Sequence, residues 1–390
     1  MQKLVKDNLS SIIKVRRYLH QNPELSFKEF KTAEYISNIL DYNNIKYEKG
    51  IVGTGIVGTI KGNIPSSKVI ALRADIDALP IQETAELDFK SVNDGVMHAC
   101  GHDMHTASLL GTLIVLNKLK SEFEGTVKFL FQPGEEVLPG GAKLMIEEGV
   151  LESPRVDKII GQHVYPDLEV GKIGIRSGIY MASADEIYFT VKGVGGHGAL
   201  PHQLVDPILI TSHIIIALQQ IVSRNSSPYI PTVLSFGDIL GKGATNVIPN
   251  EVNVKGTFRT FNEDWRNESH LKMAKMAEGI AESMGAVCEF EIKKGYPVLE
   301  NDVEMTKTVR ESAIEYLGKD NVIDLDLRMT AEDFAYYSQK IPSCFYRFGT
   351  SNKLKGIGGR LHSGDLTIDE NALEISVGLM AFAAIKELNK

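Results

Sequence analysis

The stretch Lys68-Val69-Ile70-Ala71-Leu72-Arg73-Ala74-Asp75-Ile76-Asp77 decides the fold class of this chain. Its first seven residues are predicted to form a strand, and two carboxylates follow at its end. Two further runs, Thr126–Gln132 and Lys158–His163, have the near-continuous apolar character of strands buried on both faces of a sheet. Ile51–Ile60 is also predicted to form a strand. Helical patterns at Val5–His20 and Asp103–Leu119 alternate with the strands. This alternation predicts an α/β fold.

Polar side chains gather where these strands end. Asp75 and Asp77 follow the first strand, Glu135 and Glu136 follow the second, and His163 ends the third. In open α/β sheets, ligands bind at the carboxyl ends of the strands. We therefore expect a functional site at this edge of the sheet.

The pattern changes at about residue 184. From there the order strand, helix, strand, strand, helix, strand is typical of the ferredoxin-like split unit. Its elements are predicted at 187–193, 206–222, 232–238, 251–259, 265–284 and 287–293. Helices are then expected at 303–316 and 371–388. We predict a discontinuous larger domain, 1–183 and 295–390, into which a smaller domain, 184–294, is inserted.

Composition narrows the class of protein. A chain of 390 residues exceeds the usual size of one hydrophobic core, and 43% hydrophobic with 24% charged residues is ordinary for a globular protein. The net charge of −8 and the lack of a basic cluster argue against a nucleic-acid surface. No apolar run is expected to span a bilayer, and Met1–Asp7 does not resemble a secretory signal. A cytoplasmic protein is expected.

The three cysteines, Cys100, Cys288 and Cys344, are too few and too scattered for a disulfide framework. Cys288 and Cys344 lie in apolar strand-like runs and are predicted to be small buried hydrophobic residues. Cys100 differs because it lies in a turn with His102, just before a predicted helix whose free N–H groups favour a thiolate.

The turn Met97–His105 and the pair Glu135-Glu136 together favour a metal site. Thiolate, imidazole and carboxylate suit zinc and its neighbours in the transition series. One carboxylate can bind metal while the other acts as general base on a water molecule. Taken alone, the turn could hold a structural cysteine beside a surface histidine, and the acidic pair could open a helix around 141–148. Their occurrence in one chain favours the hydrolytic metal site.

Two further histidines, His163 and His362, are candidate metal ligands. His163 at a strand end could be a core histidine, and His362 after a Gly-rich loop could be a surface residue. Both gain weight because a site for two metals needs more ligands than Cys100, His102 and Glu136 supply.

The chain resembles the zinc-type amidohydrolases that include hippurate hydrolases, N-acyl-amino-acid amidohydrolases and auxin-conjugate hydrolases, relatives of the aminoacylases and carboxypeptidase G-type exopeptidases. The matching motifs are Arg16–His20, Pro23–Ser26, Leu72–Pro80, His98–Asp103, Gln132–Glu136, Gly195–His202, Thr245–Pro249, Gly256–Arg259, Ala331–Phe334 and Leu361–Ser363. The resemblance implies a mixed-sheet, three-layer catalytic domain of the zinc exopeptidase type. It also implies that the inserted ferredoxin-like domain serves as a satellite for dimerisation or as a lid.

The resemblance implies two divalent metal ions per subunit, zinc first, with manganese, cobalt or nickel as alternatives. Their ligands would be Cys100, His102, Glu136, His163 and His362, with the thiolate or a carboxylate bridging. His105 is expected to stay outside this set. The roles implied for other residues are general base for Glu135, orientation of a site residue for Asp77, oxyanion stabilisation for His197, and binding of the substrate carboxylate or amide for Asn246 and Arg259. In relatives, His197 reaches the active site of the neighbouring subunit, so a homodimer or dimer of dimers is expected.

The predicted activity is hydrolysis of the amide bond of an N-acyl amino acid, giving a carboxylic acid and a free amino acid. The partner is thus a small molecule, with no nucleic acid and no membrane. One alternative is a di- or aminopeptidase on the same scaffold. Another is a non-catalytic homologue that binds metal or ligand, which the presence of Glu135 and all five ligands disfavours.

Overall fold

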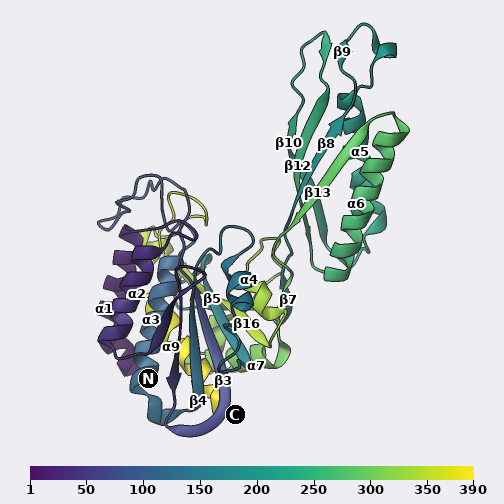
Figure 1. Cartoon of the computed structure of the whole chain (residues 1–390). Helices are drawn as coiled ribbons and strands as arrows, with labels where there is room; N and C mark the ends of the chain where they lie inside the picture. The colour runs from purple at the N-terminus through teal and green to yellow at the C-terminus, as the bar shows by residue number, and fades with distance from the viewer. The chain divides into compact units, whose positions relative to one another are not determined.

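The computed structural model describes all 390 residues and separates into two compact units (Figure 1). The first unit comprises Met1–Tyr180, Glu300–Asp326 and Asp333–Lys390. The second comprises Met181–Leu299 and Leu327–Glu332. The predicted range of the second unit was 184–294. The observed unit begins three residues earlier, ends five residues later, and also includes Leu327–Glu332.

The first unit is built on a mixed sheet of eight strands. The strands are β1 (Tyr47–Ile51), β2 (Gly55–Lys61), β3 (Ile64–Asp75), β4 (Glu124–Gln132), β5 (Lys158–Glu169), β6 (Ile173–Ile175), β15 (Val322–Asp324) and β16 (Ser343–Ser351). Their order in the sheet is β1-β2-β4-β3-β5-β16-β6-β15. The central strands β4, β3, β5 and β16 run parallel, so their carboxyl ends meet at one edge. The α/β prediction is confirmed.

Helices cover both faces of this sheet. They are α1 (Gln2–Gln21), α2 (Phe30–Tyr42), α3 (His102–Lys118), α4 (Gly141–Glu147), α7 (Val303–Leu317), α8 (Ala335–Ser338) and α9 (Ala372–Leu388). Helix α3 packs against the sheet, α1 and α9, and Leu72 of β3 lies in the core that they share. On the other face, a Cβ at Gly161 would lie 2.7 Å from the Phe334 ring beside α8, so glycine lets that ring pack on the sheet. The unit therefore has three layers.

The second unit has a four-stranded antiparallel sheet with two helices on one face. Its strands are β8 (Asp185–Lys192), β10 (Thr232–Leu240), β12 (Glu251–Thr260) and β13 (Val287–Lys294), and its helices are α5 (Pro207–Gln220) and α6 (Glu263–Ser283). The order β10-β12-β8-β13 is that of the ferredoxin-like split unit, as predicted. Alternate β8 residues Ile187, Phe189 and Val191 are buried under the helices, as period-two burial requires. The remaining short strands are β7 (Gly178–Met181), β9 (Gly196–His197), β11 (Val247–Ile248) and β14 (Leu299–Asn301).

One predicted detail is wrong, one helix was missed, and one helical segment bears on the membrane expectation. The single strand expected at 51–60 is a hairpin of β1 and β2, because the chain turns at Val52 and Gly53, both with positive φ. Helix α2 was not predicted. The helical segment Pro207–Asn225 is long and apolar enough to cross a membrane by length and composition, although no such run was expected. This is weak evidence of a span, because its residues Ile210 and Ile214 are buried in the core of the second unit.

Candidate metal centre

Five predicted ligands converge at the carboxyl edge of the first unit's sheet. The donor atoms of Cys100, His102 and His163 lie within 4.8 Å of one another, and so do those of Cys100, Glu136 and His362. His102 also lies near the adjacent carboxylates, with its Nε2 3.9 Å from Glu136 Oε1. Because the groups share members, the five side chains surround one region.

Two buried atoms in this region make no hydrogen bond of good geometry. They are Nε2 of His102 and Oε1 of Glu136, and the second of these lies 3.3 Å from His362 Nε2 as an ion pair. Buried polar atoms are almost always paired, because leaving one unpaired costs about 1–3 kcal/mol. Their separation of 3.9 Å, beside a thiol and two more imidazoles, fits the donor set of a transition-metal ion.

Local backbone geometry brings Cys100 and His102 together. Gly101 has φ 79°, and a Cβ there would lie 2.6 Å from Val164, so only glycine fits this turn. His362 also has a positive φ, 60°, and its N–H donates to Ala99 O at 2.9 Å. Such conformations in non-glycine residues are uncommon and often occur at functional sites.

Neighbouring acceptors orient two of the imidazoles. His102 Nδ1 lies 2.9 Å from Asp77 O and 3.1 Å from Asp77 Oδ1, so it carries the proton and leaves Nε2 as a donor to metal. His163 Nδ1 donates in the same way to Val164 O at 2.8 Å. Its Nε2 lies 3.4 Å from Cys100 Sγ. Asp77 also accepts the Glu136 N–H at 3.0 Å, so one carboxylate holds two predicted ligands.

His105 uses both ring nitrogens elsewhere. Nδ1 lies 2.6 Å from Asp75 Oδ1, and Nε2 accepts the Val164 N–H at 2.9 Å. Asp75 in turn accepts a hydrogen bond from the buried Arg73 guanidinium, 2.7 Å away. These partners fit the expectation that His105 lies outside the ligand set.

Glu135 lies beside the donors, next to Glu136. The residue is 6% exposed, and Oε1 accepts the Asp333 N–H at 3.4 Å. Its Oε2 lies 4.0 Å from His102 Nε2. One oxygen from each of the two adjacent carboxylates thus lies within 4.8 Å of His102 Nε2.

The pKa shifts show where the metal-free protein holds protons. Hydrogen bonds with Cys100 and Glu136 raise the pKa of His362 to about 10. Burial opposes protonation of His102, yet the charge of Asp75 and the hydrogen bond with Asp77 raise its pKa well above the ordinary value. Burial and the charge of Glu136 raise the pKa of the Cys100 thiol. The raised pKa values thus favour a proton on each of these groups when metal is absent.

We expect metal binding to release protons from this site. Thiolate and neutral imidazole bind metal, so a cation must displace the protons on Cys100, His102 and His362. Below the pKa of a ligand group, metal affinity therefore rises about tenfold for each unit of increase in pH, for each proton that the metal displaces. For His362 that range extends to about pH 10. Calorimetric titration with zinc in buffers of different ionisation enthalpy measures the released protons, and a pH-independent affinity between about pH 6 and pH 8 would contradict the expectation.

The other predicted site residues belong to the second unit. His197 in β9 pairs with Val247 in β11, and Asn246 O accepts the Gly198 N–H at 2.9 Å. His197 and Asn246 thus lie together on one exposed ribbon. Arg259 lies on β12, where its guanidinium donates to Met329 O at 3.1 Å.

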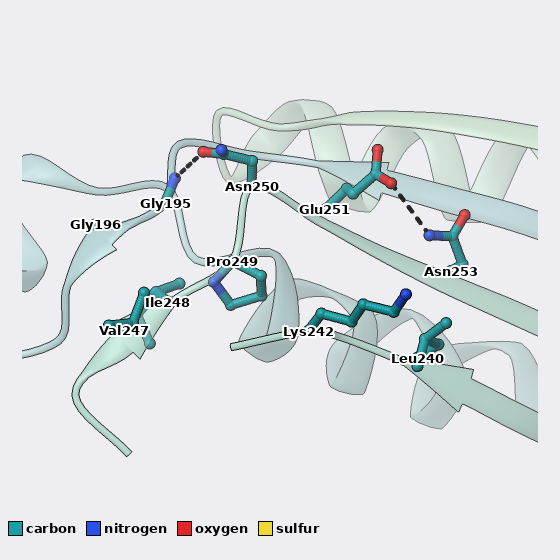
Figure 2. Close-up of a pocket in the computed structure, with 10 residues that line it drawn as sticks. All are labelled: Gly195, Gly196, Leu240, Lys242, Val247, Ile248, Pro249, Asn250, Glu251 and Asn253. Carbon is teal, nitrogen blue, oxygen red and sulfur yellow. Dashed lines mark hydrogen bonds between the residues drawn. The ribbon is translucent and has the colours of Figure 1, made fainter. Parts of the chain in front are cut away.

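A cavity of about 780 Å³ adjoins this ribbon (Figure 2). Gly196 and Val247, the neighbours of His197 and Asn246, lie on its wall. Figure 2 shows Asn250 accepting the Gly195 N–H at 2.9 Å, which holds the start of the ribbon. None of the three predicted substrate-contacting residues is among those that line it.

Some residues at the centre were missed by the sequence pattern. Asp333, which meets Glu135, also accepts from Arg73 at 2.7 Å and from the Ala142 N–H at 2.9 Å. Asp333 belongs to the motif Ala331–Phe334, but no role was predicted for it. Ser26 donates to Asp77 at 2.7 Å, although its motif also had no role.

Comparisons with known proteins agree with this architecture. The family model of peptidase family M20/M25/M40 matches residues 71–386. The N-acetylcysteine deacetylase of Bacillus subtilis (strain 168) is 41% identical over 375 residues, 96% of either chain. The N-acyl-L-amino acid amidohydrolase of Geobacillus stearothermophilus is 43% identical over 304 residues, 77% of this chain and 81% of that protein. The solved structure of the Bacillus subtilis YXEP protein, described as a dinuclear metal binding peptidase, has a TM-score of 0.85 at 38% identity and covers 98% of this chain and 99% of that one.

The fold and the candidate ligand groups together define a hydrolase of the metallopeptidase type. The chain belongs to peptidase family M20/M25/M40. The family resemblance seen in the motifs is thereby confirmed.

Proposed function

We propose that this enzyme hydrolyses the amide bond of N-acyl amino acids with two divalent metal ions. The ligands are Cys100, His102, Glu136, His163 and His362. One observation carries the proposal: five donors from separate segments meet in one region, with Glu135 beside them. The descriptions of the related deacetylase and amidohydrolase support the substrate class.

The donor set fits zinc first, with manganese, cobalt or nickel as alternatives. Bound divalent cations supply Lewis acidity, which polarises the amide carbonyl and makes a water molecule easier to deprotonate. Asp77 holds His102 and Glu136 in the orientations that ligation requires.

Glu135 is the proposed general base. It removes the proton of the attacking water and returns that proton to the nitrogen of the leaving amine. His197 stabilises the negative oxygen of the tetrahedral species. Asn246 and Arg259 bind the substrate carboxylate or amide, a role for which the guanidinium fork is suited.

We expect the protein to act as a homodimer or dimer of dimers, with His197 completing the site of the neighbouring subunit. The exposure of His197 supports this arrangement. Its ring accepts a hydrogen bond from the nearby Ala199 N–H, and the side chain is otherwise open to a neighbouring subunit. The second unit is then the dimerisation domain.

Mixing two inactive variants tests whether the site is shared. A mixed dimer of His197→Ala and Glu135→Gln subunits would contain one complete site of two, so isolated mixed dimers are expected to show about half of wild-type activity. The two variants carry different affinity tags, so that mixed dimers are isolated before assay. No activity in isolated mixed dimers would contradict sharing.

A di- or aminopeptidase is the second candidate, favoured by the description of the related YXEP protein as a peptidase. Hippurate, N-acetyl amino acids and dipeptides assayed side by side, each with zinc, manganese, cobalt and nickel, separate the two activities. We expect the acylated amino acids to have the higher kcat/KM. Faster turnover of dipeptides with a free amino group would overturn the proposed substrate class.

The proposed substrate is a small molecule, and neither nucleic acid nor membrane takes part. The net charge of −8 supports the first point. A cytoplasmic location is part of the proposal, supported by scattered cysteines that are all buried and free.

A further inference from the structure

The segment Glu24–Glu29, which we call the N-terminal strap, connects α1 to α2 and crosses two loops of the candidate metal centre. One loop follows β3 and carries Asp77. The other follows β4 and carries Glu135 and Glu136. The proposed mechanism uses no residue of the strap, although part of it belongs to a family-like motif.

The strap contacts the first loop through Ser26 and its backbone. Ser26 Oγ donates to Asp77 Oδ2 at 2.7 Å, the same oxygen that accepts the Glu136 N–H. The Ala78 N–H donates to Glu24 O at 2.8 Å. The strap therefore reaches the carboxylate that orients both His102 and Glu136.

The strap contacts the second loop through Glu29. This side chain is 0% exposed, and its Oε1 accepts the Gly134 N–H at 2.9 Å and the Phe27 N–H at 2.8 Å. Its Oε2 accepts the Thr54 hydroxyl at 2.6 Å. Burial raises the pKa of Glu29 to about 7. Burying a carboxylate without a cationic partner costs free energy. The three hydrogen bonds that Glu29 accepts offset this cost, and they tie the strap to Gly134 and Thr54.

Phe27 adds a steric constraint at the same loop. Its φ of 62° lies in the left-handed region, which is strained for an aromatic residue. A Cβ at Gly134 would lie 2.3 Å from the Phe27 ring, so the ring occupies the space of a side chain there. The loop is thus held by a hydrogen bond and by packing, one residue before Glu135.

We propose that Glu29 is a positioning residue that fixes the Gly134 turn and so directs the Glu135 and Glu136 carboxylates toward the metal centre. Ser26 acts in parallel by fixing Asp77. This inference rests on the proposed function, because it assigns the strap a role in metal binding and turnover.

Glu29→Gln is the direct test, with Glu24→Gln as its matched control. The substitution places an amide N–H₂ where a carboxylate oxygen accepts backbone or hydroxyl donors. Glu24 lies in the same strap, but its Oε2 accepts from Thr32 N and Oγ1, at 2.8 and 3.0 Å, away from the metal loops. The measurements are zinc affinity by chelator competition, kcat and KM for an N-acyl amino acid, and thermal unfolding of the metal-free proteins.

We expect Glu29→Gln to lower zinc affinity by about 10- to 100-fold, the range found for residues that orient metal ligands. We expect kcat to fall with KM little changed, since the substrate-binding residues lie elsewhere. Glu24→Gln is expected to keep wild-type zinc affinity and kcat. Equal losses in both variants would overturn the proposal, because they would indicate general damage to the strap.

Ser26→Ala keeps the test valid if Glu29→Gln does not fold. It removes one hydroxyl, and we expect zinc affinity to fall by about three- to tenfold with unfolding of the metal-free protein unchanged. Wild-type zinc affinity in Glu29→Gln, or in Ser26→Ala where Glu29→Gln does not fold, would overturn the proposal. A wild-type protein that binds no zinc at all would instead overturn the proposed function, so the two failures are distinguishable.

Discussion

Glu135→Gln is expected to lower kcat by about 100- to 10,000-fold, because a general base contributes that much to proton transfer. The amide has nearly the size of the carboxylate, so packing at this 6% exposed position is kept. Metal content is expected to stay at the wild-type level, since Glu135 is a base in the proposed mechanism and not a ligand. Steady-state kinetics and elemental analysis on the same sample measure both quantities.

The adjacent Glu136→Gln is the matched control for this prediction. It makes the same chemical change one residue later, at the carboxylate whose Oε1 lies 3.3 Å from His362 Nε2. We expect this variant to lose metal as well as activity. If Glu135→Gln kept more than about a tenth of wild-type kcat, or if the two variants behaved alike, the assignment of base and ligand would be wrong.

Cys100→Ala is expected to have the second large effect. Removing the thiolate deletes a donor that lies within 4.8 Å of four other predicted ligands, in two groups. Loss of an orienting residue alone costs about 10- to 100-fold in metal affinity, so loss of a ligand should cost at least about 100-fold. Activity at limiting zinc should fall in proportion, while Cys100→Asp, which still supplies an oxygen ligand, should keep part of both.

Cys288→Ala controls for the loss of a buried thiol as such. Cys288 lies on β13 of the second unit, is 8% exposed and is far in sequence from every predicted ligand. Burial raises the pKa of its thiol to about 12, so it is unreactive at neutral pH. Wild-type zinc affinity in Cys100→Ala, measured by chelator competition, would remove the cysteine from the ligand set.

Much of the fold could be predicted because its signals are local. The strands β4 and β5 each contain a buried apolar run, at Phe129–Phe131 and Ile159–Gly161, and period-two burial in β8 identifies a one-sided sheet. Helix α2 was missed although Ala33, Ile36 and Leu40 are spaced to form one buried face. The turn between β1 and β2 was missed because residues 51–60 are rich in β-branched residues on both sides of Gly53, which favours one strand.

The candidate site was only partly predictable for a different reason. Ligand types are visible in a sequence, so Cys100 and His102 attracted attention at once. The residues that hold them are ordinary serines and carboxylates whose partners come from distant segments, as with Ser26 and Asp77 or Glu29 and Gly134. Only the folded chain brings such pairs together, and no spacing rule predicts them.

The metal-to-protein ratio across an alanine series tests the central claim most directly. The series replaces each of the five predicted ligands in turn: Cys100, His102, Glu136, His163 and His362. Elemental analysis after dialysis against zinc should give about two ions per chain for the wild type and fewer in every variant that remains folded by circular dichroism. A wild-type ratio that all five substitutions leave unchanged would show that the metal, if bound, lies elsewhere.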